Sequence, residues 1–186
     1  MNEAVRFIVI TTPPEDVCRP IDDARKLVCS ISGSHAALAY PPHVTLRTGM
    51  LVPSKLVSSF IDAFEAVVGT WDPFPIRTDG LWITSYRDRE EEKYLVGYRV
   101  AKDPGLTAMN NRLLTYTTWR ASSRLSFEPH LTLAFDDLDL EGFVRVQHWL
   151  NDNPGILPKA FSWTCDNVGL FRRDGDSWCP YKVWRQ

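Results

Sequence analysis

A five-residue motif occurs twice in this 186-residue chain, and it constrains the fold more than any other feature. The two copies are Pro42-His43-Val44-Thr45-Leu46 and Pro129-His130-Leu131-Thr132-Leu133. Both follow the pattern Pro-His-x-Thr-Leu, and both lie in short apolar stretches of the kind that form strands. A repeated motif of this sort predicts two copies of one structural unit, each of which contributes a motif strand.

The alternation of side chains along a strand divides each motif between two faces. His43 and Thr45 point to one face and Val44 points to the other, because successive side chains of a strand lie on opposite sides of the sheet. His130 and Thr132 share a face in the same way. Each motif strand is therefore predicted to bury its apolar residues in a core and to present one imidazole and one hydroxyl on the opposite face.

Chance is a poor explanation for the duplication. With 13 Thr and 18 Leu in the chain, a given His is followed by x-Thr-Leu in about one per cent of cases, so two among four histidines is roughly a one-in-a-few-thousand event. Two satisfied structural histidines are the alternative, and a single His would favour it. The duplicated motif favours a functional pair.

The remaining pattern predicts an α+β fold in one domain over residues 1–186. We expect two pseudo-symmetric lobes, each an antiparallel sheet with helices on its outer face, and a central cleft between them. In each half, a motif strand is followed by a helix and a hairpin. The predicted helices span Pro20 to Gly33, Pro53 to Gly69, Asp103 to Trp119 and Leu140 to Leu150, and the predicted strands span 5–10, 43–50, 74–85, 94–100 and 130–135, with a last hairpin at the C-terminal end.

Composition limits the partners and the location. A formal net charge of -2 gives no field that would hold long duplex nucleic acid, so a nucleic-acid ligand must be small or bound locally. No leader pattern and no apolar run of membrane-spanning length occur, so we expect a cytoplasmic monomer that does not bind membranes. The four scattered cysteines predict reduced thiols.

Two imidazoles and two hydroxyls suit the cleavage of a phosphodiester. That reaction needs a base for the attacking oxygen, an acid for the leaving oxygen, and donors for the charged non-bridging oxygens. Histidine titrates near neutrality, so one ring can act as base while the other acts as acid. His43, His130, Thr45 and Thr132 are therefore the predicted catalytic residues. No third ligand is evident near either His, so we expect no metal and no cofactor.

The paired His-x-Thr motifs, the order of elements and the terminal hairpin with Trp178 and Tyr181 resemble those of the two-histidine (2H) phosphoesterase superfamily, especially its 2'-5' RNA ligase-like and cyclic-phosphodiesterase members. The resemblance covers nearly the whole chain. It implies a bilobal α+β fold and metal-free hydrolysis of 2',3'-cyclic phosphates or related 2',5'-linked phosphodiesters, on RNA ends or small nucleotides. It also implies that both motifs surround one phosphate. Which His is acid and which is base stays open.

Four further residues are candidates for binding the substrate. Arg47 lies two residues beyond Thr45, so on an unbroken strand it reaches the same face. Aromatic rings near the expected cleft can stack on a base, and the resemblance places the terminal hairpin there. The aromatic candidates are Tyr181, Tyr40 and Trp178.

Four functions remain open from the sequence, one of them a histidine-metal protein, which predicts bound metal in the purified sample and loss of activity with a chelator. The first is hydrolysis of a 2',3'-cyclic phosphate, and the second is a 2',5'-phosphodiesterase activity on short oligonucleotides. The third is an RNA-end binding module without catalysis, which the two intact motifs disfavour because binding does not need two titrating imidazoles.

Overall fold

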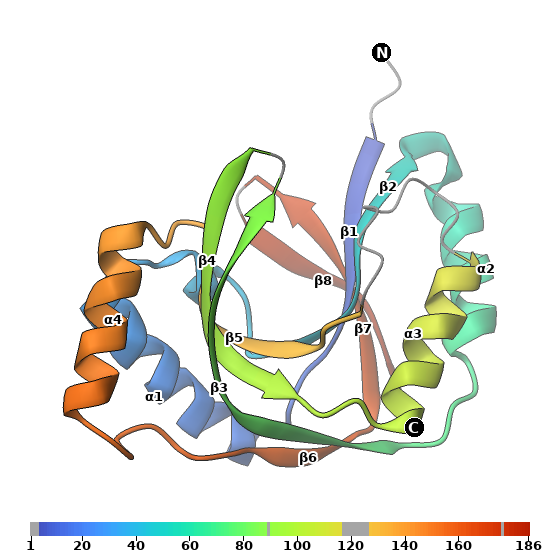
Figure 1. Cartoon of the computed structure of the whole chain (residues 1–186). Helices are drawn as coiled ribbons and strands as arrows, with labels where there is room; N and C mark the ends of the chain where they lie inside the picture. The colour runs from blue at the N-terminus through green and yellow to red at the C-terminus, as the bar shows by residue number, and fades with distance from the viewer. Residues whose placement is uncertain (1–3, 89, 117–126, 176) are drawn as a thin grey trace.

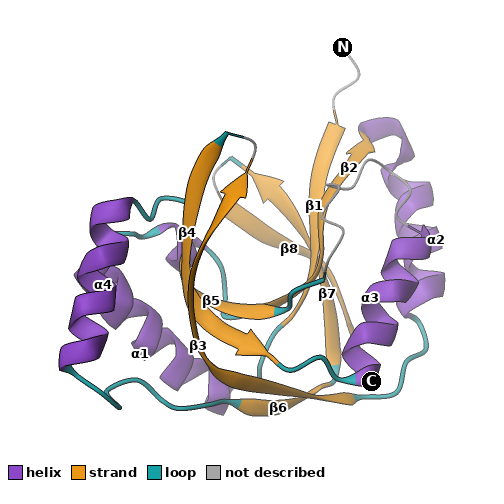
Figure 2. Ribbon diagram, viewed as in Figure 1, coloured by secondary structure: helices purple, strands orange, loops and turns teal. Residues whose placement is uncertain are grey.

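The computed structural model describes residues 4–88, 90–116, 127–175 and 177–186 of the chain. It is a mixture of helices and one antiparallel sheet (Figures 1 and 2). The expected helix end at Trp119 lies outside the described residues. The elements in chain order are β1 (Ala4–Thr11), α1 (Glu15–Ser32), η1 (Ala36–Ala39), β2 (Val44–Pro53), η2 (Ser54–Leu56), α2 (Val57–Val68), β3 (Phe74–Asp88), β4 (Glu91–Val100), α3 (Pro104–Tyr116), β5 (His130–Ala134), α4 (Leu140–Asp152), β6 (Ser162–Cys165), β7 (Asn167–Asp174) and β8 (Ser177–Arg185).

The sheet has eight strands in the order β6-β3-β4-β5-β2-β1-β7-β8, and the described pairings are antiparallel. The motif strands β2 and β5 are neighbours at its centre. Outward from this pair, β1 corresponds to β4, β7 to β3 and β8 to β6. The predicted α+β fold with two related halves is confirmed, and the two halves share one continuous curled sheet.

The chain interleaves these halves. Strands β7 and β8 from the C-terminal end join β1 and β2, because β1 pairs with β7. Helices α1 and α4 cover the flank of β4 and β5, whereas α2 and α3 cover the flank of β2 (Figure 1). Each half therefore combines elements from both ends of the chain, which the sequence pattern did not predict.

The core lies between the sheet and the helices, as the alternation of the motif strands requires. Val44, Leu46, Leu131 and Leu133 are all 0% exposed in the main apolar cluster. Burial of side chains of this size stabilises the fold by about 1.5 to 3 kcal/mol each. Their burial fixes the orientation of both strands, because a slip of one residue would exchange the two faces.

The first helix begins earlier than the predicted start at Pro20. The structure begins α1 at Glu15, so Pro20 lies inside the helix. The carbonyl of Pro14 accepts from the backbone nitrogen of Cys18 at 2.8 Å, and the acidic residues Glu15 and Asp16 occupy the first turn, where the helix dipole favours negative charge. These interactions extend the helix past a residue that normally starts one.

Asp137, just after β5, holds the segment that leads to the first motif. Its carboxylate accepts bonds from the Ser34 hydroxyl and from the backbone nitrogens of His35 and Ala36, the latter two at 2.7 and 3.0 Å. Partial burial opposes ionisation, but these bonds outweigh it and lower the pKa of Asp137. The segment that precedes His43 is thus tied to the end of the second motif strand.

The four cysteines are free. No helix among the described residues is long and apolar enough to cross a membrane.

We expect Asp137→Asn to lower the free energy of unfolding by about 1 to 2 kcal/mol, because an amide cannot accept on both sides as the carboxylate does. Urea titration measures the change. The matched control is Asp136→Asn, which removes the same charge from an exposed neighbour and should alter stability by less than about 0.5 kcal/mol. Equal effects from both variants would contradict this account.

Candidate active site

One residue pair joins the two motif strands, and it determines what the opposite face presents. Val44 pairs with Leu131 in the antiparallel register of β2 and β5, and both side chains are 0% exposed in the core. The residues on either side of this pair therefore point away from the core. The four side chains on that face are His43, Thr45, His130 and Thr132.

The register sets each imidazole against the hydroxyl of the other motif. In antiparallel order around the Val44 and Leu131 pair, His43 lies against Thr132 and Thr45 lies against His130. All four side chains are half-buried. The structure therefore brings together the four predicted catalytic residues, at the centre of the sheet.

Both imidazoles are held in the same way. His43 Nδ1 lies 2.8 Å from the carbonyl oxygen of Pro41, and His130 Nδ1 lies 2.8 Å from that of Glu128. A carbonyl oxygen only accepts, so in each ring Nδ1 carries the proton and donates it. Each neutral ring therefore keeps Nε2 as the nitrogen with a lone pair, available for proton transfer.

The motif prolines account for this arrangement. Pro42 and Pro129 are buried, and each follows the residue whose carbonyl holds the imidazole. A proline restricts the residue before it to extended backbone, which fixes the direction of the carbonyl of Pro41 and of Glu128. The proline in Pro-His-x-Thr-Leu thus orients the ring of the His that follows it.

Burial makes His43 a neutral group at physiological pH. It lowers the pKa of His43 to about 4, against the opposing effect of the bond to Pro41, and the charges of Arg25 and His130 lower it further. A neutral imidazole with a free Nε2 is suited to accept a proton. The mutual effect of the two histidines is consistent with both rings facing one space.

His130 lies beside an aromatic ring and an arginine. The Trp82 ring meets the His130 ring edge-on at 5.5 Å between centroids, and the Arg99 guanidinium lies 5.4 Å from the centroid of Trp82. Arg99 pairs with His130 across β4 and β5 and is exposed. A positive charge is therefore available next to the second motif.

Gly97 allows β4 to approach the second motif closely. It pairs with Thr132 next to an irregularity in the β4–β5 register, and a Cβ at this position would lie 2.5 Å from the carbonyl oxygen of Leu131. No other residue type fits there without moving the backbone of β5.

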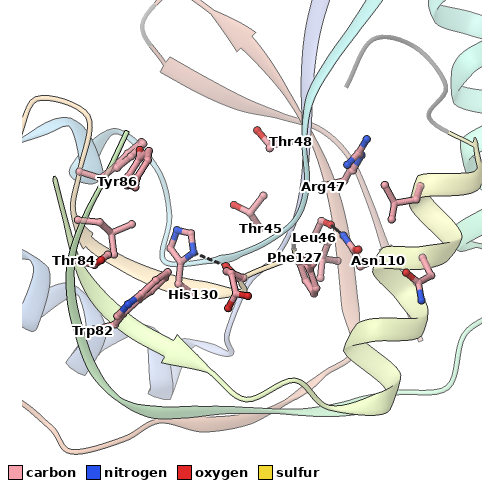
Figure 3. Close-up of a pocket in the computed structure, with 15 residues that line it drawn as sticks. Thr45, Leu46, Arg47, Thr48, Trp82, Thr84, Tyr86, Asn110, Phe127 and His130 are labelled. Atoms are coloured by element: carbon pink, nitrogen blue, oxygen red, sulfur yellow. Dashed lines mark hydrogen bonds between the residues drawn. The ribbon is translucent and has the colours of Figure 1, made fainter. Parts of the chain in front are cut away.

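A cavity of about 540 Å³ opens beside His130 (Figure 3). This volume is within the range of small-molecule sites. Its wall combines aromatic rings with hydroxyl and amide groups. Figure 3 shows Trp82, Thr84 and Tyr86 on one side of His130 and Thr45 on the other. The lining residues include Thr45, Arg47, Thr48, Trp82, Thr84, Tyr86, Asn110, Phe127, His130 and Phe135.

Of the predicted binding residues, Tyr40 lies next to His43, and Trp178 lies against Tyr40. The Tyr40 ring is 5.5 Å from the His43 ring and stacks on Trp178 at 6.1 Å. Trp178 is 8% exposed and belongs to a small cluster with Ile10, which pairs with Thr45 and so lies on the same face. Tyr40 can contact a ligand at His43, while Trp178 supports Tyr40 from behind.

The other two binding candidates are placed differently from each other. Arg47 lines the cavity, although β2 is irregular there, since Val9 pairs with Arg47 and the next pair joins Ile10 to Thr45. Tyr181 meets Phe7 edge-on at 5.4 Å, and Phe7 stacks on Phe60 of α2. Tyr181 therefore lies toward the helix-covered face and does not line the described cavity.

Sequence reasoning missed Trp82, Arg99 and Gly97. The alternation of Trp82, Thr84 and Tyr86 along β3 is a signal for one strand face, and these three residues do share the cavity wall. Arg99 and Gly97 have no such local signal, because their roles come from pairing with β5.

Within the part of the chain that the structure describes, no group of three or more His, Cys, Asp or Glu side chains could hold a metal ion.

The chain was compared with models of known protein families. Residues 13–177 match the model of the 2'-5' RNA ligase superfamily. A comparison with curated protein sequences gives no match.

Solved structures share the fold across nearly the whole chain. E. coli LigT in complex with 3'-AMP is 17% identical, with 98% of each chain covered and a TM-score of 0.68. The protein TT0787 of Thermus thermophilus is 14% identical, with 97% of each chain covered and a TM-score of 0.65. Usb1 of Kluyveromyces marxianus is 13% identical, with 95% of this chain and 96% of that chain covered and a TM-score of 0.56.

Nitrogen NMR of the histidine rings should show the Nδ1–H tautomer for His43 and a pKa of about 4. Because the pKa in the unfolded chain is about 6.5, His43 does not reduce stability above that pH, and stability falls as the pH drops from about 6.5 toward 4. His43→Gln should remove this part of the pH dependence in urea unfolding. A native pKa close to 6.5 would contradict the described burial.

Proposed function

The chain belongs to the 2'-5' RNA ligase superfamily, and from this premise we propose that it hydrolyses a 2',3'-cyclic phosphate on an RNA end or a small nucleotide, without a metal ion. Membership of the family supports phosphoesterase-type activity. The observation that carries the finer proposal is the arrangement of two imidazoles, each held at Nδ1 by a backbone carbonyl, opposite two threonine hydroxyls on one face of the sheet.

His43 takes the role of general base in this reaction. Its imidazole is neutral at physiological pH, and Nδ1 is committed to the Pro41 carbonyl, so Nε2 is the atom that accepts the proton of the attacking water. The new bond forms between the water oxygen and phosphorus.

His130 takes the role of general acid. As the imidazolium it donates the Nε2 proton to the ribose oxygen that leaves when its bond to phosphorus breaks. The product is a 2'- or 3'-phosphomonoester, and the ribose hydroxyl on the neighbouring carbon is released. Thr45 and Thr132 donate hydrogen bonds to the non-bridging oxygens, whose charge grows in the transition state. Transfer of one proton at each imidazole leaves the pair in the reversed protonation state, which solvent restores.

Relatives support a nucleotide as the ligand. Solved structures of E. coli LigT contain 3'-AMP and NADP+. For this chain, the aromatic and amide groups of the cavity beside His130 suit a nucleobase, and Arg47 and Arg99 supply positive charge near the phosphate.

A 2',5'-phosphodiesterase activity on short oligonucleotides is the second candidate. It is favoured by aromatic rings on both sides of the four motif side chains, with Tyr40 beside His43 and Trp82 beside His130. Such a pair suits a nucleoside on each side of one phosphate.

Replacing either catalytic His by Ala should reduce kcat by about 10²- to 10⁴-fold, because each removes one proton-transfer group. Steady-state kinetics with a 2',3'-cyclic mononucleotide measures this, and thermal unfolding verifies the fold. His35→Ala and His148→Ala are the matched controls and should keep wild-type activity. Full turnover in both His43→Ala and His130→Ala would exclude the proposed mechanism.

A substrate panel in the presence of EDTA separates the candidate functions. It contains 2',3'-cyclic mononucleotides, RNA with a 2',3'-cyclic end, ADP-ribose cyclic phosphate and a 2',5'-linked dinucleotide. We expect the highest kcat/KM for a 2',3'-cyclic phosphate, with no loss in EDTA. Preference for the dinucleotide would establish the second candidate instead, and binding without turnover of any substrate would indicate a binding module.

A further inference from the structure

Arg25 of α1 is a buried cation close to the first motif. Its side chain is 3% exposed, and its guanidinium donates to the Asp22 carboxylate at 2.9 Å and to the carbonyl oxygen of Tyr40 at 2.8 Å. The buried Nε has no hydrogen-bond partner among the described residues. A buried guanidinium that is not fully bonded is a costly way to stabilise a fold, so its effect on the site is the better explanation.

The contacts of Arg25 lead directly to the His43 ring. Arg25 holds the carbonyl of Tyr40, and the next carbonyl along the chain, that of Pro41, accepts from His43 Nδ1. The Tyr40 ring also lies 5.5 Å from the His43 ring. Two consecutive carbonyls are thus fixed, one by Arg25 and one by the imidazole, so a shift of Arg25 would move the base.

Arg25 also acts on His43 by its charge. Burial is the main reason why the pKa of His43 is low, and the charges that lower it further are those of Arg25 from α1 and His130 from β5. On the segment that carries His43, the nearest titratable ring is that of Tyr40. Burial raises the pKa of this phenol, so Tyr40 stays neutral. The acidic partner of Arg25 is Asp22, whose carboxylate pairs with the guanidinium.

We propose that Arg25 is the positioning residue that makes His43 rather than His130 the general base, because it holds the Tyr40 and Pro41 segment that orients the His43 ring. This inference rests on the proposed function and deepens it. The second motif has a different cation in the corresponding region, since Arg99 is exposed and lies over Trp82. The two sides of a nearly symmetric site thereby acquire different roles.

The test compares Arg25→Gln with the wild-type chain by nitrogen NMR of the His43 ring and by the pH profile of kcat/KM for a 2',3'-cyclic mononucleotide. The neutral variant should titrate His43 at higher pH, because the imidazolium no longer faces a buried cation. The acid limb of the profile should move upward by the same amount. Arg25→Met keeps the length of the side chain and is the second neutral variant if Gln is not tolerated.

Arg145→Gln is the matched control. Arg145 also donates to backbone carbonyls, those of Ile31 at 3.2 Å and Ser32 at 2.8 Å, and pairs with Glu141. Its loss should lower the melting temperature and leave the acid limb in place. A merely structural role for Arg25 predicts the same behaviour for both arginines.

Arg25→Lys separates charge from position. Lys keeps the charge but cannot hold Asp22 and Tyr40 with one planar fork, so kcat should fall about tenfold through misplacement of the base, with KM and the acid limb unchanged. A folded Arg25→Gln or Arg25→Met with an unmoved His43 titration, or an Arg25→Lys variant with wild-type kcat, would overturn the inference. The NMR titration needs no turnover, so a shifted titration in a chain that cleaves no substrate would refute the proposed function alone.

Discussion

The site depends on one strand pairing, that of Val44 with Leu131. Both side chains are fully buried, so hydrophobic burial holds β2 against β5 in a single register. The same register places each imidazole opposite the hydroxyl of the other motif. The core therefore enforces the arrangement of the four motif side chains from the opposite side of the sheet, and a shift of one residue in either strand would turn its histidine into the core.

Two nearly equivalent motifs acquire unequal surroundings because different elements cover them. The buried Arg25 of α1 bonds to the carbonyl of Tyr40 in the segment that precedes the first motif, whereas the second motif opens on a cavity and lies beside Trp82. Both rings are held by a backbone carbonyl two residues earlier, so their tautomers match. A neutral ring and a ring beside a ligand cavity suit the proposed base and acid, since the two groups must differ in protonation at one pH.

The sequence predicted the parts of this fold that depend on local pattern. Alternation along the motif strands placed His43 and Thr45 on one face and the apolar residues in the core, and the resemblance to the 2H phosphoesterase superfamily is confirmed by the family match. Features that depend on contacts between distant elements could not be predicted from local pattern. Gly97 is needed only because β4 meets β5. Arg25 reaches the site only because α1 packs against the segment that contains Tyr40. The predicted start of α1 at Pro20 was wrong, because the interactions that start this helix come from residues that precede Pro20. Tyr181 contacts Phe7 in a hairpin whose register shifts between Leu170 and Phe171, which no local pattern encodes.

The central claim is that both imidazoles and both hydroxyls act on one phosphoryl group. A crystal structure of the protein with a nucleoside 2',3'-cyclic vanadate, which mimics the five-coordinate transition state, tests it directly. The account predicts vanadium between the two rings, with His43 Nε2 and His130 Nε2 at its two apical oxygens and the threonine hydroxyls on the equatorial ones. Vanadate bound elsewhere, or in contact with only one of the two motifs, would contradict it.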